Sequence, residues 1–387
     1  MNDLRWVGPV ARSGLPASAR QSGLSLIELM VGVAISLVIL AALVALFVNT
    51  SRSSREFARA NSMIESGRLA VQVLEADIAH AGFWGTYVPH FDDQTASAAP
   101  GDVPTAVPDP CLAYDPATWT TGYVDDLIGM PVQAYDDATV CAGVITDRLA
   151  NTDVLIVRHV EPCVAGGPSP NCDAVIPGRL YFQSTLCLSD VTERVLDTAG
   201  FTLLRRDCAT PAEVRRFMSS IYYVRDYSVT PGDGIPTLMR SSFDLAGGVL
   251  EHQPPVPLIE GVEGFRVELG VDDLSETGDA VDYTSAVAWA DPETRTTPTN
   301  RGDGVPDDEF VRCTTAAPCT ADELMNLTAV KFYILARSRE PSQGQTDTKT
   351  YALGAGTTLG PFTDAFQRHV FITTVRLPNT SGRRITP

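Results

Sequence analysis

An uncharged apolar run near the N-terminus constrains this chain more than any other feature. From Leu29 to Val48, twenty consecutive residues carry no charge. A helix rises about 1.5 Å per residue, so this run spans roughly 30 Å, the thickness of the hydrocarbon layer of a bilayer. We therefore expect a transmembrane helix. Glu28 stands at the start of the run, where a carboxylate is costly unless a cation partners it.

The residues before the run do not have the order of a secretory signal. Such a signal ends its apolar region at a small-residue cleavage site, whereas the small residue here, Gly23, precedes the run and follows Arg20. A cut after Gly23 would leave the apolar helix on the mature chain and make Leu24 its N-terminus. The new α-amine would lie about one helical turn from Glu28. Between staggered helices, the amine of one subunit would pair with Glu28 of the next and set the axial register.

The stretch Gly23-Leu24-Ser25-Leu26-Ile27-Glu28-Leu29-Met30-Val31 resembles the class III signal and helix start of type IV pilins and pseudopilins. The resemblance implies that a prepilin peptidase cuts after Gly23 and that Leu24 becomes the N-methylated terminus. It also implies that Glu28 is the carboxylate that sets subunit register. One departure is Leu24, where that family usually has Phe.

The apolar run continues as an amphipathic pattern. Two stripes repeat every seven residues: Phe57, Ile64, Val71 and Ile78, and beside them Ala60, Gly67, Leu74 and Ala81. This heptad pattern predicts a helix whose apolar seam packs on the chain's own globular domain. We expect a leader over 1–23, a transmembrane or pilus-core helix over 24–48 and an amphipathic continuation over 49–82, which Gly82 ends.

Charge excludes one class of partner and suggests an orientation. The chain has a formal net charge of −18, and removal of the leader makes it more acidic still. Bulk electrostatics therefore oppose binding to nucleic acid. Arg12 and Arg20 precede the apolar run, which predicts a cytoplasmic N-terminus and a periplasmic C-terminal domain anchored in the inner membrane.

The cysteines point to an oxidising compartment. Their number is even and all follow the apolar run: Cys111, Cys141, Cys163, Cys172, Cys187, Cys208, Cys313 and Cys319. This favours disulfides, and the sequence has no C-x-x-C that would suggest zinc or a redox site. We expect Cys163–Cys172 and Cys313–Cys319 as local pairs, and Cys111–Cys141 and Cys187–Cys208 to complete the set.

Beyond the helix the chain reads as a series of strands. The predicted strands are 153–160, 179–182, 201–204, 220–225, 238–240, 262–271, 329–337 and 368–377. In the strand at 262–271, Phe265, Val267 and Leu269 alternate with polar residues, which predicts one buried face. One N-terminal helix followed by many strands predicts an α+β fold, with the long helix packed on a largely antiparallel sheet in a β-rich domain over 83–387.

Two stretches read as irregular, and one as a short helix. Residues 87–126 are rich in Ala, Pro, Asp, Thr and Gly and are expected to form a long connection pinned by Cys111. Residues 272–308 are polar and read as an exposed insertion. Residues 324–327 are expected to form a short helix.

The C-terminal part strengthens the resemblance. The residues that carry it are Gly261-Val262-Glu263-Gly264-Phe265-Arg266-Val267, the Gly-Asp-Gly-Val-Pro-Asp of 302–307, the strand over 329–338, and Phe371-Ile372-Thr373-Thr374-Val375-Arg376-Leu377 with Pro378-Asn379. They resemble the PilW-type minor pilins of type IV pili. The resemblance implies a pilin-like fold.

One acidic turn invites a metal hypothesis. In residues 301–309 four carboxylates surround glycine and proline, and oxygen ligands of this kind suit calcium. The candidates are Asp303, Asp307 and Asp308, but the spacing is not that of an EF-hand, so a solvated turn is the simpler interpretation. No other cofactor is expected. The sequence has no G-x-S-x-G, H-E-x-x-H or phosphate loop, so we expect no enzyme.

The resemblance implies a minor prepilin that acts in pilus assembly, in an initiating or tip complex, and hence in twitching motility or adhesion. Its partners would be other minor and major pilins, the prepilin peptidase, the inner-membrane assembly platform and a tip adhesin. Two alternatives stay open: a minor pseudopilin of a type II secretion system, and a membrane-anchored adhesin or calcium-binding module.

Overall fold

The computed structural model describes residues 23 and 25–385, apart from residues 138, 170, 171 and 355. The chain divides within its first helix into two compact units, one that ends at Phe57 and one that begins at Ala58. Leu24 and nearly all of the expected leader lie outside the described residues.

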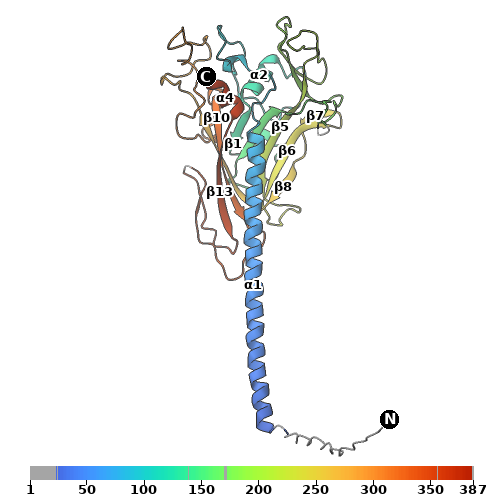
Figure 1. Ribbon diagram of the computed structural model, residues 1–387, viewed down its shortest axis with the longest axis vertical. Coiled ribbons are helices and arrows are strands. Elements are labelled where there is room, and N and C mark those ends of the chain that lie inside the picture. Colours follow the sequence, from blue (N-terminus) through green and yellow to red (C-terminus); the bar gives the residue numbers. More distant parts are fainter. Residues whose placement is uncertain (1–22, 24, 138, 170–171, 355, 386–387) are drawn as a thin grey trace, which may run out of the picture. The chain divides into compact units, whose positions relative to one another are not determined.

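The first helix, α1, runs from Leu26 to Ile78 and is drawn in blue in Figure 1. No proline interrupts it, and most of its first half is Leu, Val, Ile and Ala. It is the one helix in the described part of the chain that is long and apolar enough to cross a membrane by length and composition. After Ile78, a turn leads to Gly82, whose φ of +72° suits glycine.

The part of α1 that belongs to the second unit buries one face. Its buried residues are Met63, Gly67, Ala70, Leu74 and Ile78, a spacing of three and four that keeps them on one side of a helix. One of the two predicted stripes is therefore largely right. The stripe that begins at Phe57 is not buried along its length, since Phe57 is 68% exposed. From residue 63 onward the buried residues are spaced by three or four, as the 3.6-residue period of a helix requires.

The second unit has two main sheets, and every strand pairing among its described residues is antiparallel. The larger sheet has eight strands in the path β1-β2-β5-β3-β4, with β6 paired to β5, β7 and β8. Its strands are β1 (Val132–Tyr135), β2 (Val154–Val160), β3 (Tyr181–Ser184), β4 (Arg194–Asp197), β5 (Val214–Arg225), β6 (Thr237–Ala246), β7 (Val249–His252) and β8 (Val256–Glu260).

The smaller sheet has the order β13-β10-β9. It consists of β9 (Val262–Val271), β10 (Leu327–Arg337) and β13 (Arg368–Arg376), and a separate hairpin joins β11 (Tyr351–Ala352) to β12 (Thr358–Leu359). In Figure 1, β10 and β13 lie to the left of the upper part of α1, and β6 and β8 to its right. The main apolar core contains Leu74 and Ile78 of α1 together with residues of both sheets, so the helix is the spine on which they pack.

Short helices complete the fold: α2 (Thr121–Gly129), α3 (Ala321–Met325), α4 (Pro378–Arg384), and the 3₁₀ turns η1 (His90–Asp92) and η2 (Thr139–Cys141). The α+β architecture predicted from the sequence is confirmed. The stretch 87–126 was expected to be irregular throughout, but it contains η1 and the start of α2, where the Thr120 side chain accepts a hydrogen bond from the Tyr123 amide. Such a cap stabilises a helix too short for periodicity to reveal.

Three further expectations were wrong. The predicted strand at 201–204 contributes only the single bridge Leu204–Pro211. The stretch 272–308 is not simply exposed, because Asp272, Tyr283 and Arg301 are buried. The second face of β9 is also buried: the Arg266 guanidinium lies 2.8 Å from the Asp153 carboxylate, and Glu268 accepts a hydrogen bond from the Tyr333 hydroxyl. Paired polar groups can be buried, so their alternation did not mark a solvent face.

Candidate functional site

The first candidate site is the start of α1. Ser25 and Glu28 form reciprocal hydrogen bonds there: the Ser25 amide donates to Glu28 Oε2 at 3.0 Å, and the Glu28 amide donates to Ser25 Oγ at 3.2 Å. This is a capping box, which satisfies amides that the first turn of a helix leaves without partners. Glu28 is exposed, and so is Gly23. In a single subunit, therefore, the Glu28 carboxylate closes its own helix end and stays accessible.

The apolar half of α1 is exposed along its whole length. Exposed fractions of its large side chains range from 39% at Val48 to 76% at Leu26. The Ser36 hydroxyl donates to the Gly32 carbonyl within the same helix, so this polar group needs no outside partner. A soluble protein rarely exposes so large an apolar surface. Lipid or the helices of other subunits must cover it.

A partly buried carboxylate, Asp77, ties the other half of α1 to the larger sheet. Tyr222 of β5 donates its hydroxyl hydrogen to Asp77 Oδ2 at 2.8 Å, and His159 Nε2 of β2 lies 3.0 Å from Asp77 Oδ1. The other ring nitrogen of His159 faces the Val160 carbonyl at 2.9 Å. Burial alone would raise the pKa of Asp77, but hydrogen bonds and charge from His159, with the Tyr222 bond, hold this pKa below its usual value.

The C-terminal helix α4 caps the end of α1. The Asn379 side chain donates to the carbonyl oxygens of Ala79 and Ala81 at 3.3 and 3.1 Å, and the Arg383 guanidinium donates to the Gly82 carbonyl at 2.7 Å. Since α1 ends at Ile78, these carbonyls belong to the turn that follows it. Residues about 300 positions apart thus fix where the spine ends.

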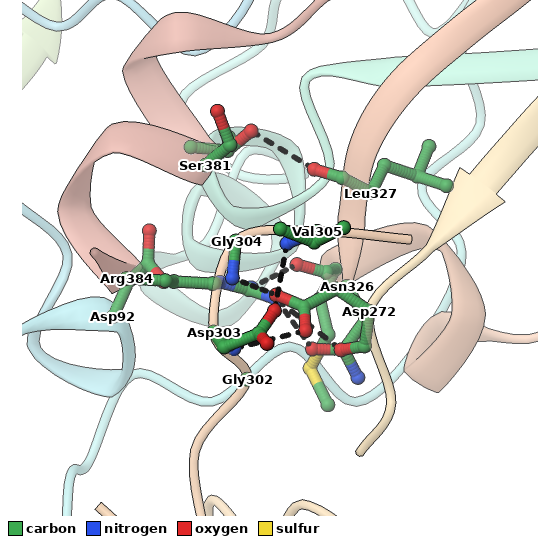
Figure 2. A network of polar contacts seen from close by, with 12 residues as sticks. Asp92, Asp272, Gly302, Asp303, Gly304, Val305, Asn326, Leu327, Ser381 and Arg384 are labelled. Atoms are coloured by element: carbon green, nitrogen blue, oxygen red, sulfur yellow. Dashed lines mark hydrogen bonds and ion pairs between the residues drawn. The ribbon is translucent and has the colours of Figure 1, made fainter. Parts of the chain in front are cut away.

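The last residue of α4, Arg384, lies in the protein interior (Figure 2). Its guanidinium bonds to Asp92 Oδ1 at 2.9 Å and to Asp272 Oδ2 at 3.1 Å, with further bonds to Asn326 Oδ1 and the Met325 carbonyl. Burial raises the pKa of Asp272 to about 6, against the opposing influence of Arg384. The C-terminus, η1 and the segment before α3 are thereby joined in one buried polar network.

The acidic turn forms part of this network. The amides of Asp303 and Gly304 donate to the Asp272 carboxylate at 3.0 and 2.9 Å, as Figure 2 shows. A Cβ at Gly302 would overlap the same carboxylate. This turn therefore surrounds an anion that the chain itself supplies.

The three calcium candidates do not gather around a common point with other ligands. Asp303 Oδ1 accepts the Val305 amide, Asp307 Oδ2 accepts the Leu274 amide, and Asp308 is exposed. Burial raises the pKa of Asp307. Among the described residues, no group of three or more His, Cys, Asp or Glu side chains is placed to hold a metal ion.

The eight cysteines form four disulfides, and these join the pairs named from the sequence. They are Cys111–Cys141, Cys163–Cys172, Cys187–Cys208 and Cys313–Cys319. The first encloses a loop of 30 residues and fixes the long connection after α1 to η2. Disulfides of this kind staple segments that have little regular structure.

Comparison with known proteins shows where the similarities lie. Residues 221–379 match the family of the type IV pilus-assembly protein W, and residues 18–44 match the prokaryotic N-terminal methylation motif. Over these two regions the chain is similar to PilW-like type IV pilins. The matched regions cover the first part of α1 and the chain from the end of β5 through β13, and they leave β1, β2, β3 and β4 unmatched.

One solved structure of a pilin matches this chain weakly. The type IV-like pilin TTHA1219 from Thermus thermophilus is 12% identical, with a TM-score of 0.31, over 82% of this chain and 97% of that one. A likeness at this level carries no argument about this chain. No curated protein gives a significant match.

Sequence reasoning missed the polar groups that anchor the spine, namely Asp77 and Arg384. Asp77 lies on the helix three positions from Leu74 and one from Ile78, both fully buried. A carboxylate so close to the apolar stripe is a signal that could have suggested a buried partner. Arg384 gave no such signal, because its partners Asp92 and Asp272 lie 292 and 112 residues away in the sequence.

Proposed function

We propose that the protein is a minor prepilin of the type IV pilus, cut after Gly23 and then methylated on Leu24. The exposed apolar half of α1 carries this proposal, because it is long enough to span a bilayer and its apolar surface has to be shielded from water by lipid or by other helices. The matches to the pilus-assembly protein W family and to the N-terminal methylation motif support it.

Assembly would exchange one environment of α1 for another. In the inner membrane the apolar half lies in lipid, and in the pilus it joins a bundle of equivalent helices. Glu28 would then leave its capping bond with Ser25 and pair with the Leu24 amine of a neighbouring subunit. In an apolar bundle an unpaired carboxylate is costly, so only helices staggered by the right distance would associate.

The second unit would stand in the periplasm and later at the cell surface. Four disulfides support an oxidising compartment, and the arginines before the apolar run support a cytoplasmic N-terminus. Its bulk is difficult to repeat along a shaft, which favours an initiating or tip complex with other minor pilins, built on the inner-membrane platform. Twitching motility or adhesion would depend on that complex.

Substitution of Gly23 by Val tests this proposal in cells. The full-length variant should remain an uncut precursor in the membrane fraction and be missing from sheared pili, while the parent chain is cut and recovered with pili. A variant of mature size would overturn the cleavage site. A deletion strain that twitches normally but fails to secrete would instead assign the protein to a type II secretion system.

A further inference from the structure

The two edges of the smaller sheet differ in how their backbone groups are satisfied. β10 is the central strand, so β9 and β13 each have one edge that faces away from it. In an antiparallel ladder, the residues of an edge strand alternate between bonding to the neighbour and pointing outward. The outward residues of each edge can therefore be identified from the bonds that flank the strand.

On β9 the outward backbone groups are occupied. The Phe265 carbonyl accepts from the Asp153 amide at 2.9 Å, and the Val267 amide donates to the Asp153 carboxylate at 2.9 Å. Leu269 exchanges both of its backbone bonds with Val311, and the Val271 carbonyl accepts from Asp307. This edge is closed by the chain's own segments.

On β13 the alternation assigns the even-numbered residues to the outside. The Leu377 amide donates to the Thr328 carbonyl, and the Gln367 carbonyl accepts from the Ser338 amide, so odd-numbered residues face β10. Val370, Ile372 and Thr374 therefore turn their amides and carbonyls outward. Among the described residues no group bonds to these backbone atoms. Ile372 is 57% exposed and Thr374 is exposed as well.

This edge also lacks the features that normally keep an edge strand from pairing. The register between β10 and β13 is regular over nine residue pairs, with no bulge. Its central run, residues 370–375, contains β-branched and aromatic residues but neither charge nor proline. Proteins usually protect an exposed edge with charge, proline, a bulge or a covering segment. A long unprotected edge is a template for another strand.

We propose that the outer edge of β13 accepts an extended segment of a different protein chain, with apolar or β-branched residues at its centre and a carboxylate that meets Arg376. Main-chain hydrogen bonds would supply the affinity and the carboxylate would set the direction. Arg376 is exposed at one end of the edge, where its guanidinium donates to the neutral Ser381 hydroxyl and Gly304 carbonyl, and β13 carries no acidic residue.

A second copy of this chain fits the edge poorly. Antiparallel pairing of two β13 strands about Ile372 would place Arg376 of one copy opposite Arg368 of the other, at both ends. Arg368 is buried and already paired with Glu263, Asp347 and Asp364, so this arrangement offers Arg376 no carboxylate of its own. The net charge of −18 on each copy adds a repulsion.

Residue-resolved amide exchange on the full-length protein in detergent tests the proposal. The probe is a synthetic nine-residue peptide in which Val and Thr alternate and one end carries Glu. Alone, the amides of Val370, Ile372 and Thr374 should exchange freely while the odd-numbered amides are protected. With the probe, the three outward amides should become protected. If they still exchange freely at saturating peptide, or are already protected without it in a concentration-dependent way, the proposal is overturned.

Two comparisons sharpen the test. Ile372→Pro removes an outward amide without touching the bonds to β10, and it should weaken probe binding about tenfold, whereas Ile372→Ala, which keeps the amide, should bind nearly as the parent does. If Ile372→Pro melts well below the parent, Thr374→Pro takes its place. Equal binding by the proline and alanine variants would refute strand addition. A probe with Lys in place of Glu should bind more weakly, and equal binding would refute the role of Arg376.

Discussion

Phe371 of β13 lies against Gly67 of α1 and fills the space that a side chain at position 67 would occupy. The contact brings the edge strand directly onto the helix backbone. It explains why glycine, which weakens a helix by up to about 1 kcal/mol relative to alanine, is found in the middle of the spine.

Gly67→Ala should therefore destabilise the protein, although alanine favours helix. The new methyl group would displace the Phe371 ring, and overpacking of this kind costs about 1–3 kcal/mol. The measurement is the thermal midpoint of the full-length protein in detergent. Gly122→Ala is the matched control, because Gly122 lies in α2 with open space around its Cα; it should leave the midpoint unchanged or raise it slightly. A neutral Gly67→Ala would show that α1 and β13 are not packed this closely.

Asp77→Asn should lower the free energy of unfolding by about 1–3 kcal/mol at neutral pH, since the buried bonds to His159 and Tyr222 lose their charged acceptor. The pKa of Asp77 is lower in the folded chain than in the unfolded one. Its contribution is thus complete above the unfolded pKa and is lost as the pH falls through the folded value. The difference between parent and variant should therefore shrink as the pH falls below about 4.

Denaturant titrations at neutral pH and below about pH 4 provide the measurement. Glu65→Gln, at an exposed position of the same helix, is the control and should show a much smaller loss of stability. A difference for Asp77→Asn that does not shrink below about pH 4 would contradict the assignment.

Arg384→Met should cost about 3–5 kcal/mol, because it leaves the buried Asp272 carboxylate without its cation and removes one of the two arginines that pair with Asp92. Resistance to proteolysis and the thermal midpoint of the full-length protein should both fall. Arg206→Met, which alters an exposed arginine, should change neither. Equal stability of the two variants would mean that the C-terminal helix does not hold α1 and the acidic turn in place.

Glu28→Ala should leave membrane insertion and cleavage intact and reduce the number of surface pili. The control is Ser25→Ala, which removes the side-chain half of the capping box but keeps the carboxylate, so it should assemble far better. If both variants lose piliation equally, the helix cap rather than subunit register explains the effect. Unchanged piliation in Glu28→Ala would count against the register role.

The sequence predicted the parts of the fold that repeat a local pattern. β2, β10 and β13 are runs rich in β-branched and aromatic residues, and α1 is a long uncharged run with an apolar stripe behind it. These patterns depend on which face of an element is buried. The pairing within the short loops Cys163–Cys172 and Cys313–Cys319 could also be predicted, because cysteines so close in the sequence have few alternative partners.

The remaining features depend on contacts between distant segments. Glu268 can lie on a buried face of β9 because it accepts a hydrogen bond from the Tyr333 hydroxyl. The glycine-rich turn at 302–304 surrounds the Asp272 carboxylate rather than a metal ion. The edge position of β13 could not be predicted either, since it depends on the order of the strands in the sheet. In each case the deciding partner lies tens to hundreds of residues away, and no local pattern records it.

The central claim is that a peptidase exposes the amine of Leu24 and that the resulting chain is built into pili. The most direct test is the intact N-terminal mass of the protein recovered from sheared pili. The account predicts a chain that begins at Leu24 and carries one added methyl group. A chain that still contains its first 23 residues, that begins elsewhere, or that is absent from pili would contradict it.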